Sequence, residues 1–204
     1  MTDRAPVSIA VEADSNRLAY SGGALSPTEQ AVISRRWGWL LYAEYRLTTM
    51  RAYLQTIVIR AIGLPLLYLA SMGLGLGALV DSGAGGVDGV SYLVFVAPAL
   101  LVSSVVMEAT GEFTYPVMSG FKWQKHFFAA SASPLSPKQV ALGELVAVGL
   151  KFTAEAFVFW LALLTFGAVT SPHSWLVVLI APLAALAFGV PLMAFAATQQ
   201  DEGA

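Results

Sequence analysis

Residues 114–144 read TYPVMSGFKWQKHFFAASASPLSPKQVALGE and separate two long apolar runs. This stretch holds Lys122, Lys125 and Lys138, three of the 11 Lys and Arg residues in the chain. Apolar runs of such length are typical of membrane spans, and Lys and Arg bias short loops towards the cytoplasmic side. We therefore expect a cytoplasmic loop here. Its basic and aromatic residues favour a docking surface over a passive spacer.

The composition indicates an all-α integral membrane protein. Of 204 residues, 57% are hydrophobic and 12% are charged, whereas soluble domains have about 25% charged residues. The chain has no cysteine, so disulfides, thiolate metal sites and cysteine nucleophiles are excluded. The net charge of −2 gives no sign of a nucleic-acid partner.

The N-terminal region is predicted to divide into a tail and a helix at the membrane surface. Residues 1–25 show no helical or strand period, and we expect a disordered cytoplasmic tail. A helix start near Pro27 opens residues 26–56, which mix aromatic side chains with arginines. This mixture favours an amphipathic interfacial helix whose arginines face phosphate and water, namely Arg35, Arg36, Arg46 and Arg51. A solvated lead-in to the first span is the simpler alternative.

Residues 57–204 form the predicted transmembrane domain. Four stretches are apolar and long enough to cross a bilayer, at about 57–80, 90–110, 140–169 and 175–197, with a cytoplasmic loop at 112–139. Arg60 is expected near the inner end of the first span, and Gly73 with Gly77 favours ordinary helix packing there. Ser136 and Pro137 are typical of the start of the third helix. The outer connections carry no Lys or Arg, so both termini are predicted to be cytoplasmic.

The charges within the spans are the first candidate site. Glu144, Lys151 and Glu155 are spaced to lie on one face of the third span, and a charge at the bilayer centre costs about 2.5 to 3.5 kcal/mol. We expect this face to look into the bundle or an aqueous cavity and not into lipid, with Glu108 of the second span as a neighbour of Lys151. A structural pairing of helices and a translocation lining both remain open.

The second candidate site is the aromatic and basic run of the loop. Residues 117–130 predict a short helix, and rings beside cations with nothing obvious to bury them are typical of a binding surface. The candidate docking residues are Phe121, Lys122, Trp123, Lys125 and His126. A solvated connector is the simpler interpretation. No phosphate-binding loop, HExxH or GxSxG motif occurs, so we expect no catalytic residue, cofactor site or metal site in this chain.

The run MSGFKWQKHFFAASASPLSPKQVALGEL, preceded by VSYLVFVAPALLVSSVVMEATGEFTYPV, resembles the permease subunits of type-2 ABC exporters. The similar branch is that of the nodulation lipo-oligosaccharide and daunorubicin-type exporters, and the resemblance runs from about Trp37 onward. It implies an interfacial helix before the first span and a coupling helix between the second and third spans. That helix would dock on a separate ATP-binding subunit, which would hold ATP and magnesium.

The resemblance also implies an assembly and a location. Two permeases, identical or paralogous, would join two ATP-binding subunits in the bacterial plasma membrane and move a lipid-like, drug-like or glycolipid substrate outward. Permeases of this family have six spans, and this chain resembles one that lacks the last two. The competing class of function is a membrane scaffold whose loop recruits a soluble partner without transport.

Overall fold

The computed structural model describes residues 27–59 and 63–199, and this part of the chain is helical, with short connections and no β-strand. The prediction of an all-α protein is confirmed. The expected tail at residues 1–25 and the expected position of Arg60 lie outside the described residues. Within the described ranges, four helical segments are long and apolar enough to cross a membrane: Leu66–Gly83, Tyr92–Lys122, Pro137–Thr165 and Ser174–Thr198. The chain is therefore a multi-pass membrane protein.

The N-terminal region forms a long helix, α2 (Pro27–Arg51), and a short one, α3 (Leu54–Val58). The first span consists of three segments, α4 (Leu64–Ala70), the π-helical η2 (Ser71–Leu76) and α5 (Gly77–Ala84). The second begins with α6 (Tyr92–Phe113) and continues as α7 (Tyr115–Lys122). A connecting helix, α8 (His126–Ser131), leads to the third span, α9 (Pro137–Thr165). A turn of 3-10 helix, η3 (Ser174–Leu176), precedes the fourth span, α10 (Val177–Thr198).

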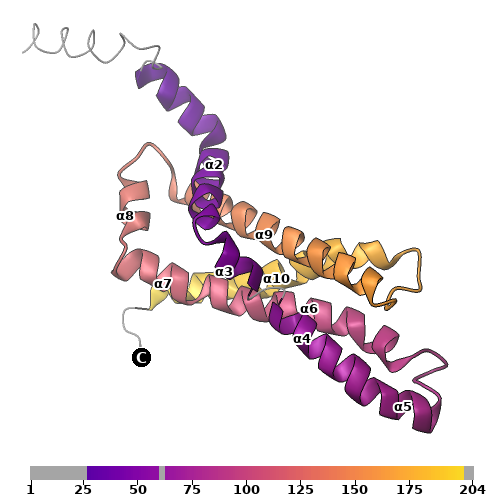
Figure 1. Ribbon diagram of the computed structural model, residues 1–204. Coiled ribbons are helices and arrows are strands. Elements are labelled where there is room, and N and C mark those ends of the chain that lie inside the picture. Colours follow the sequence, from indigo (N-terminus) through magenta and orange to yellow (C-terminus); the bar gives the residue numbers. More distant parts are fainter. Residues whose placement is uncertain (1–26, 60–62, 200–204) are drawn as a thin grey trace, which may run out of the picture.

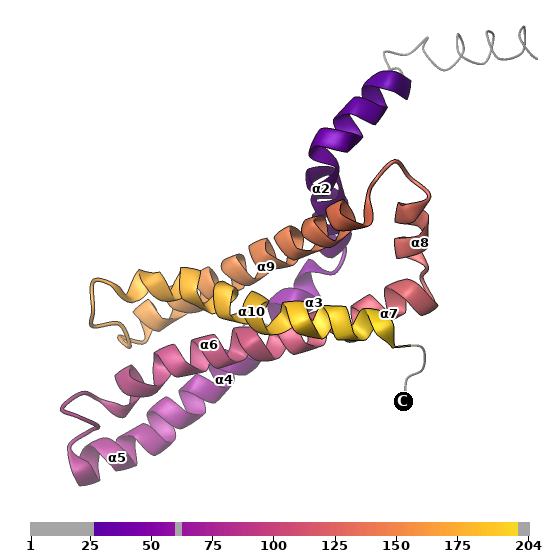
Figure 2. The same ribbon diagram turned by 180° about the vertical axis from the view of Figure 1, so that it is seen from behind.

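The spans pack with α10 between α6 and α9 (Figures 1 and 2). The first span lies against α6, and α2 crosses the beginning of α9 steeply relative to the bundle. Helix α8 joins α7 to α9 at the end of the bundle where α2 enters and α10 finishes. The steep crossing of α2 is the arrangement expected of a helix lying in an interface while the spans cross it.

The second span extends further than the sequence indicates, and the single helix expected over 117–130 is wrong. Helix α6 ends at Phe113, and α7 follows along nearly the same line to Lys122 (Figure 1). Pro116 lies in the first turn of α7, where its missing N–H breaks no helical hydrogen bond. Lys125 then adopts a left-handed conformation with φ of 54°, which ends α7 and turns the chain into α8.

The third span begins as predicted and ends earlier than predicted. The Ser136 hydroxyl accepts a hydrogen bond from the Gln139 N–H at 3.3 Å, and the Gln139 side chain accepts one from the Ser136 N–H at 3.0 Å. This capping box satisfies two backbone donors that a helix start leaves free. At the other end α9 ends at Thr165. Gly167 takes a left-handed φ of 65°, and backbone N–H groups around it donate hydrogen bonds back to the carbonyl oxygens of the last helical turn.

Two glycines allow α2 and α9 to approach closely. A Cβ on Gly143 would lie 2.5 Å from the Trp39 carbonyl oxygen and 2.9 Å from the Tyr42 Cβ. A Cβ on Gly38 would lie 2.6 Å from Leu135 in the turn before α9. In addition, the Gln139 side chain donates hydrogen bonds to the carbonyl oxygens of residues 34 and 35 on α2. Helix α2 is therefore fixed to the start of the third span by packing and by polar contacts.

This close crossing predicts the effect of a single methyl group. Gly143→Ala should lower the free energy of unfolding by about 1–3 kcal/mol, because a backbone carbonyl must move to admit the new Cβ. The matched control is Gly111→Ala on α6, where a Cβ meets nothing within 4 Å and helix propensity favours alanine. Denaturant unfolding in detergent, followed by circular dichroism, measures both. Equal stabilities of the two variants would contradict the close crossing.

Candidate functional site: a buried ion network and the loop beside it

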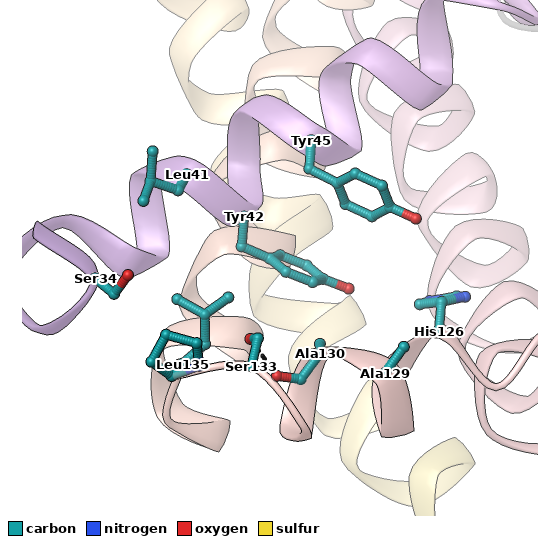
Figure 3. Close-up of a pocket in the computed structure, with 10 residues that line it drawn as sticks. Ser34, Leu41, Tyr42, Tyr45, His126, Ala129, Ala130, Ser133 and Leu135 are labelled. Carbon is teal, nitrogen blue, oxygen red and sulfur yellow. Dashed lines mark hydrogen bonds between the residues drawn. The ribbon is translucent and has the colours of Figure 1, made fainter. Parts of the chain in front are cut away.

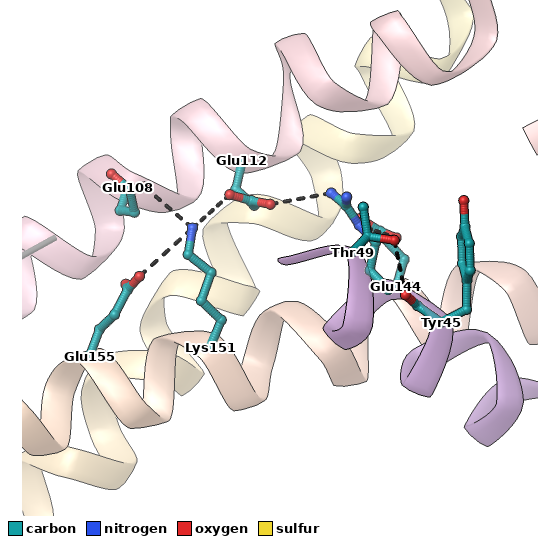
Figure 4. Close-up of polar contacts among 8 residues, drawn as sticks. Tyr45, Thr49, Glu108, Glu112, Glu144, Lys151 and Glu155 are labelled. Carbon is teal, nitrogen blue, oxygen red and sulfur yellow. Dashed lines mark hydrogen bonds and ion pairs between the residues drawn. The ribbon is translucent and has the colours of Figure 1, made fainter. Parts of the chain in front are cut away.

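Six charged side chains from three helices meet inside the bundle (Figure 4). Helix α2 contributes one, α6 two and α9 three, and they are Arg46, Glu108, Glu112, Glu144, Lys151 and Glu155. Glu144, Lys151 and Glu155 are buried, which confirms that the charged face of α9 looks into the bundle. Their burial is sustained by pairing, because an isolated charge in apolar surroundings is costly.

Arg46 forms the most specific contact of the network. Its Nε donates to both carboxylate oxygens of Glu144, at 2.8 and 3.0 Å, and its Nη2 donates to Glu112 Oε1 at 3.3 Å. Burial opposes the charged guanidinium, but the adjacent Glu144 carboxylate outweighs this and raises the pKa of Arg46. Arg46 therefore remains a cation and ties α2 to both α6 and α9.

Lys151 holds the second half of the network. Its Nζ donates to Glu112 Oε2 at 2.7 Å and to Glu108 Oε1 at 3.3 Å, and it lies 3.7 Å from Glu155 Oε1. The contact between Lys151 and Glu108 and the pairing of Lys151 with Glu155 are present as predicted. Glu112 uses one oxygen for Arg46 and the other for Lys151, so it is the shared member of the two clusters.

Sequence reasoning missed Arg46 and Glu112 as members of this site. Arg46 was expected to face phosphate and water, and that expectation is wrong, because its side chain is only 16% exposed. Glu112 was not among the charges predicted for this site. A usable signal existed in the spacing of Glu108 and Glu112, which places two acids one helical turn apart on α6 with a single lysine opposite them on α9.

The aromatic residues of the loop are less exposed than expected. Phe121 stacks on Phe127 with ring centroids 4.6 Å apart and meets Phe128 edge to face at 5.9 Å. His126 lies beside Phe127 at 4.3 Å, and a Cβ on Gly120 would be 2.5 Å from the His126 ring. Burial, with a smaller contribution from Arg46, lowers the pKa of His126. Phe121 and His126 therefore hold α7 against α8 more than they offer a surface.

Trp123 and Lys125 are the candidate docking residues that remain open to solvent. Trp123 is 50% exposed at the end of α7, and Lys125 is exposed at the turn. Tyr115 packs against Trp123 with ring centroids 5.6 Å apart, and the Lys122 ammonium lies 6.0 Å from the Trp123 ring. These residues form one ridge of rings and cations beside the turn into α8.

A groove of about 410 Å³ runs between α2 and α8 (Figure 3). Tyr42 and Tyr45 line it from α2, and His126 and Ala130 line it from α8. The Tyr42 hydroxyl is buried and has no hydrogen-bond partner among the described residues, and burial followed by the Glu144 charge raises its pKa. The groove thus presents a polar atom in apolar surroundings at the same end as the loop. No group of three or more metal-ligating side chains occurs in the described ranges.

Comparisons with known proteins give one group of relatives. The chain is 30% identical to Nodulation protein J of Rhizobium leguminosarum bv. viciae over 111 residues, which cover 49% of this chain and 41% of the relative. It is 26% identical to Nodulation protein J of Rhizobium meliloti over 115 residues, covering 56% of this chain and 42% of that protein.

A third match, to Nodulation protein J of Rhizobium leguminosarum bv. trifolii, has 31% identity over 111 residues, covering 49% of this chain and 41% of that protein. The chain spans about two-fifths of the length of these curated relatives. No family model matches, and no solved structure matches.

A double-mutant cycle tests the link between α2 and α9. Arg46→Met and Glu144→Gln should each destabilise the protein, because each removes the contact between these two buried charges. The double variant should lose less than the sum, with a coupling of about 1–3 kcal/mol. The control cycle combines Arg46→Met with the remote substitution Asp81→Asn. Their effects on the free energy of unfolding should add to within about 0.5 kcal/mol. Unfolding in detergent supplies all the free energies, and additivity in both cycles would contradict the contact between Arg46 and Glu144.

The second span and loop resemble the transport-permease family, and the similarity to the Nodulation protein J relatives supports that assignment. It does not distinguish between branches of the family.

Proposed function

We propose that this chain is the transmembrane permease subunit of an ATP-driven type-2 ABC exporter. Its substrate would be lipid-like, drug-like or glycolipid, taken from the cytoplasm or the inner leaflet and moved outward. The proposal is supported by the multi-pass helical fold, the sequence of the second span and loop, and the similarity to Nodulation protein J. The chain itself would bring no ATP site, so hydrolysis belongs to a separate ATP-binding subunit with magnesium.

The observation that carries the proposal is the position of the loop relative to the ion network. Helix α7 continues the line of α6, which bears Glu108 and Glu112, and α8 leads into α9, which bears Glu144 and Lys151. A partner that moves the exposed ridge at Trp123 and Lys125 therefore acts on both spans at once. The ion network would transmit that displacement to α2 at the membrane surface.

The expected surroundings follow from this role. We propose a bacterial inner-membrane location with the N-terminus and the loop in the cytoplasm, because the loop holds three Lys residues and the outer connections hold no Lys or Arg. A second permease, identical or paralogous, would complete the translocation path, and membrane lipids would cover the outward faces of the spans. Glu108, Glu144, Lys151 and Glu155 would then serve helix pairing at the inner end of that path.

Co-purification tests the docking step. The chain is expressed with the ATP-binding subunit encoded nearest to it, and recovery of that subunit is measured by affinity pull-down. Trp123→Ala with Lys125→Glu should reduce recovery at least about tenfold, because an exposed aromatic anchor at an interface centre contributes about 2 kcal/mol or more. Trp175→Ala is the matched control, since Trp175 is 49% exposed, close to the 50% of Trp123, and belongs to the opposite end of the bundle.

Two outcomes separate transport from the scaffold alternative. Because the chain has no cysteine, spin labels attach only at introduced sites such as Thr110→Cys on α6 and Leu142→Cys on α9. An ATP-dependent change in the distance between these labels supports a permease. Docking without any change in that distance favours a scaffold. Equal recovery by wild type and the Trp123 variant would refute docking through this ridge.

A further inference from the structure

A pocket distinct from the loop groove lies where the last turns of α2 and helix α3 face the middle of α9. Its volume is about 280 Å³. The wall is mainly apolar and includes Leu47, Met50, Leu54, Ile57, Val58 and Val158. Lys151 and Glu155 also line it from α9, and Arg51, which is exposed, lines it from the end of α2. This size lies just below the usual range for small-molecule sites, about 300–1,000 Å³, and suits an alkyl chain or a small ring.

Glu155 brings an unpartnered acceptor to this pocket. The residue is 8% exposed, and its Oε1 accepts no hydrogen bond from any described residue. The nearest cation, the Lys151 ammonium, is 3.7 Å away, while its shorter contacts go to Glu112 at 2.7 Å and Glu108 at 3.3 Å (Figure 4). A buried acceptor without a hydrogen bond is costly, so a donor arriving in the pocket would be stabilised.

The charge balance of the ion network specifies the donor. Two cations, Arg46 and Lys151, serve four carboxylates, so the network lacks positive charge when all of them are ionised. Arg46 is engaged with Glu144 and Glu112, and Lys151 is divided among three acids. Glu155 is the carboxylate with the weakest pairing and also the one that lines the pocket. A cation with N–H donors would neutralise the Glu155 carboxylate and donate a hydrogen bond to its free oxygen.

We propose that this pocket binds an amphiphile through a primary ammonium group, which donates to Glu155 while its apolar body lies along α2, α3 and α9. Two sources share this chemistry: a free alkylamine and the ammonium of a phospholipid headgroup. The exposed guanidinium of Arg51 suits a phosphate next to the ammonium, as in phosphatidylethanolamine. The site is formed by this chain alone, so it is independent of the proposed docking to an ATP-binding subunit.

Photolabelling tests the site in phosphatidylcholine nanodiscs, whose lipid ammonium has no N–H. The probe is a primary alkylamine carrying a diazirine, and crosslinks are mapped by peptide mass spectrometry. We expect labels on residues 47–58 and 150–158. Dodecylammonium should compete with the probe, whereas dodecyltrimethylammonium, which cannot donate, should not.

Three variants separate binding from folding. Glu155→Gln should weaken labelling about tenfold or more, as expected when a hydrogen bond to a charged group is lost. Ala154→Leu keeps every charge, fills the pocket and should weaken labelling similarly. Glu44→Gln removes an exposed carboxylate from α2 and should label like the wild type. Each variant is first matched to the wild type by size-exclusion profile.

The outcomes decide the proposal and the source. Labelling that is unchanged in Glu155→Gln, or competed equally by the quaternary amine, would overturn it. Absence of labelling in the wild type would also overturn it, and would mean that a proton, not an ammonium, balances Glu155. If the labelling is specific, phosphatidylethanolamine is then added to the nanodiscs. Loss of the labelling signal supports the lipid as the occupant, and an unchanged signal supports a free amine.

Discussion

The two-sided pairing of Glu112 is the interaction on which the arrangement of the helices depends. One carboxylate oxygen faces Arg46 of α2 and the other faces Lys151 of α9, while the residue itself belongs to α6. Each of these charges would be expensive alone in apolar surroundings. Together they are best paired when the three helices lie in the observed relative position. The network therefore specifies where α2 meets the bundle, which apolar contacts alone would leave loosely defined.

The short contacts of the network require that α2 and α9 lie close together, and the sequence provides for this locally. Gly143 on α9 lets the backbone of α2 approach, and Glu144, which Arg46 binds, is the next residue. Gln139, one turn earlier, caps α9 and donates to two carbonyl oxygens of α2. Helix start, helix crossing and ion pair thus occupy successive turns of one segment. A change in any of them shifts the position of the others.

Much of this fold is encoded in local patterns, and the rest depends on contacts between distant residues. The four spans follow from apolar length, the start of α9 follows from Ser136 and Pro137, and the inward face of α9 follows from the spacing of its charges. Nothing local distinguishes Arg46 from the other arginines of α2, because its partner Glu144 is 98 residues away. The break at Lys125 was missed for a similar reason. The stacking of Phe121 on Phe127 stabilises a tight turn that helix propensity does not predict.

The two cations differ in what movement they permit. The Arg46 Nε–H donates a charge-assisted, bifurcated hydrogen bond to both oxygens of Glu144, so α2 and the start of α9 are held as a unit. Lys151 has a flexible stem and two acceptors on α6, Glu108 and Glu112, which lie about 6 Å apart along the helix axis. If α6 slides along α9, Lys151 can exchange one acid for the other without losing its pairing. In that event the weaker contact between Arg46 and Glu112, at 3.3 Å, is the one that breaks. In the proposed mechanism, a push on the loop would displace α6 in this way, and Arg46 would keep α2 moving together with α9.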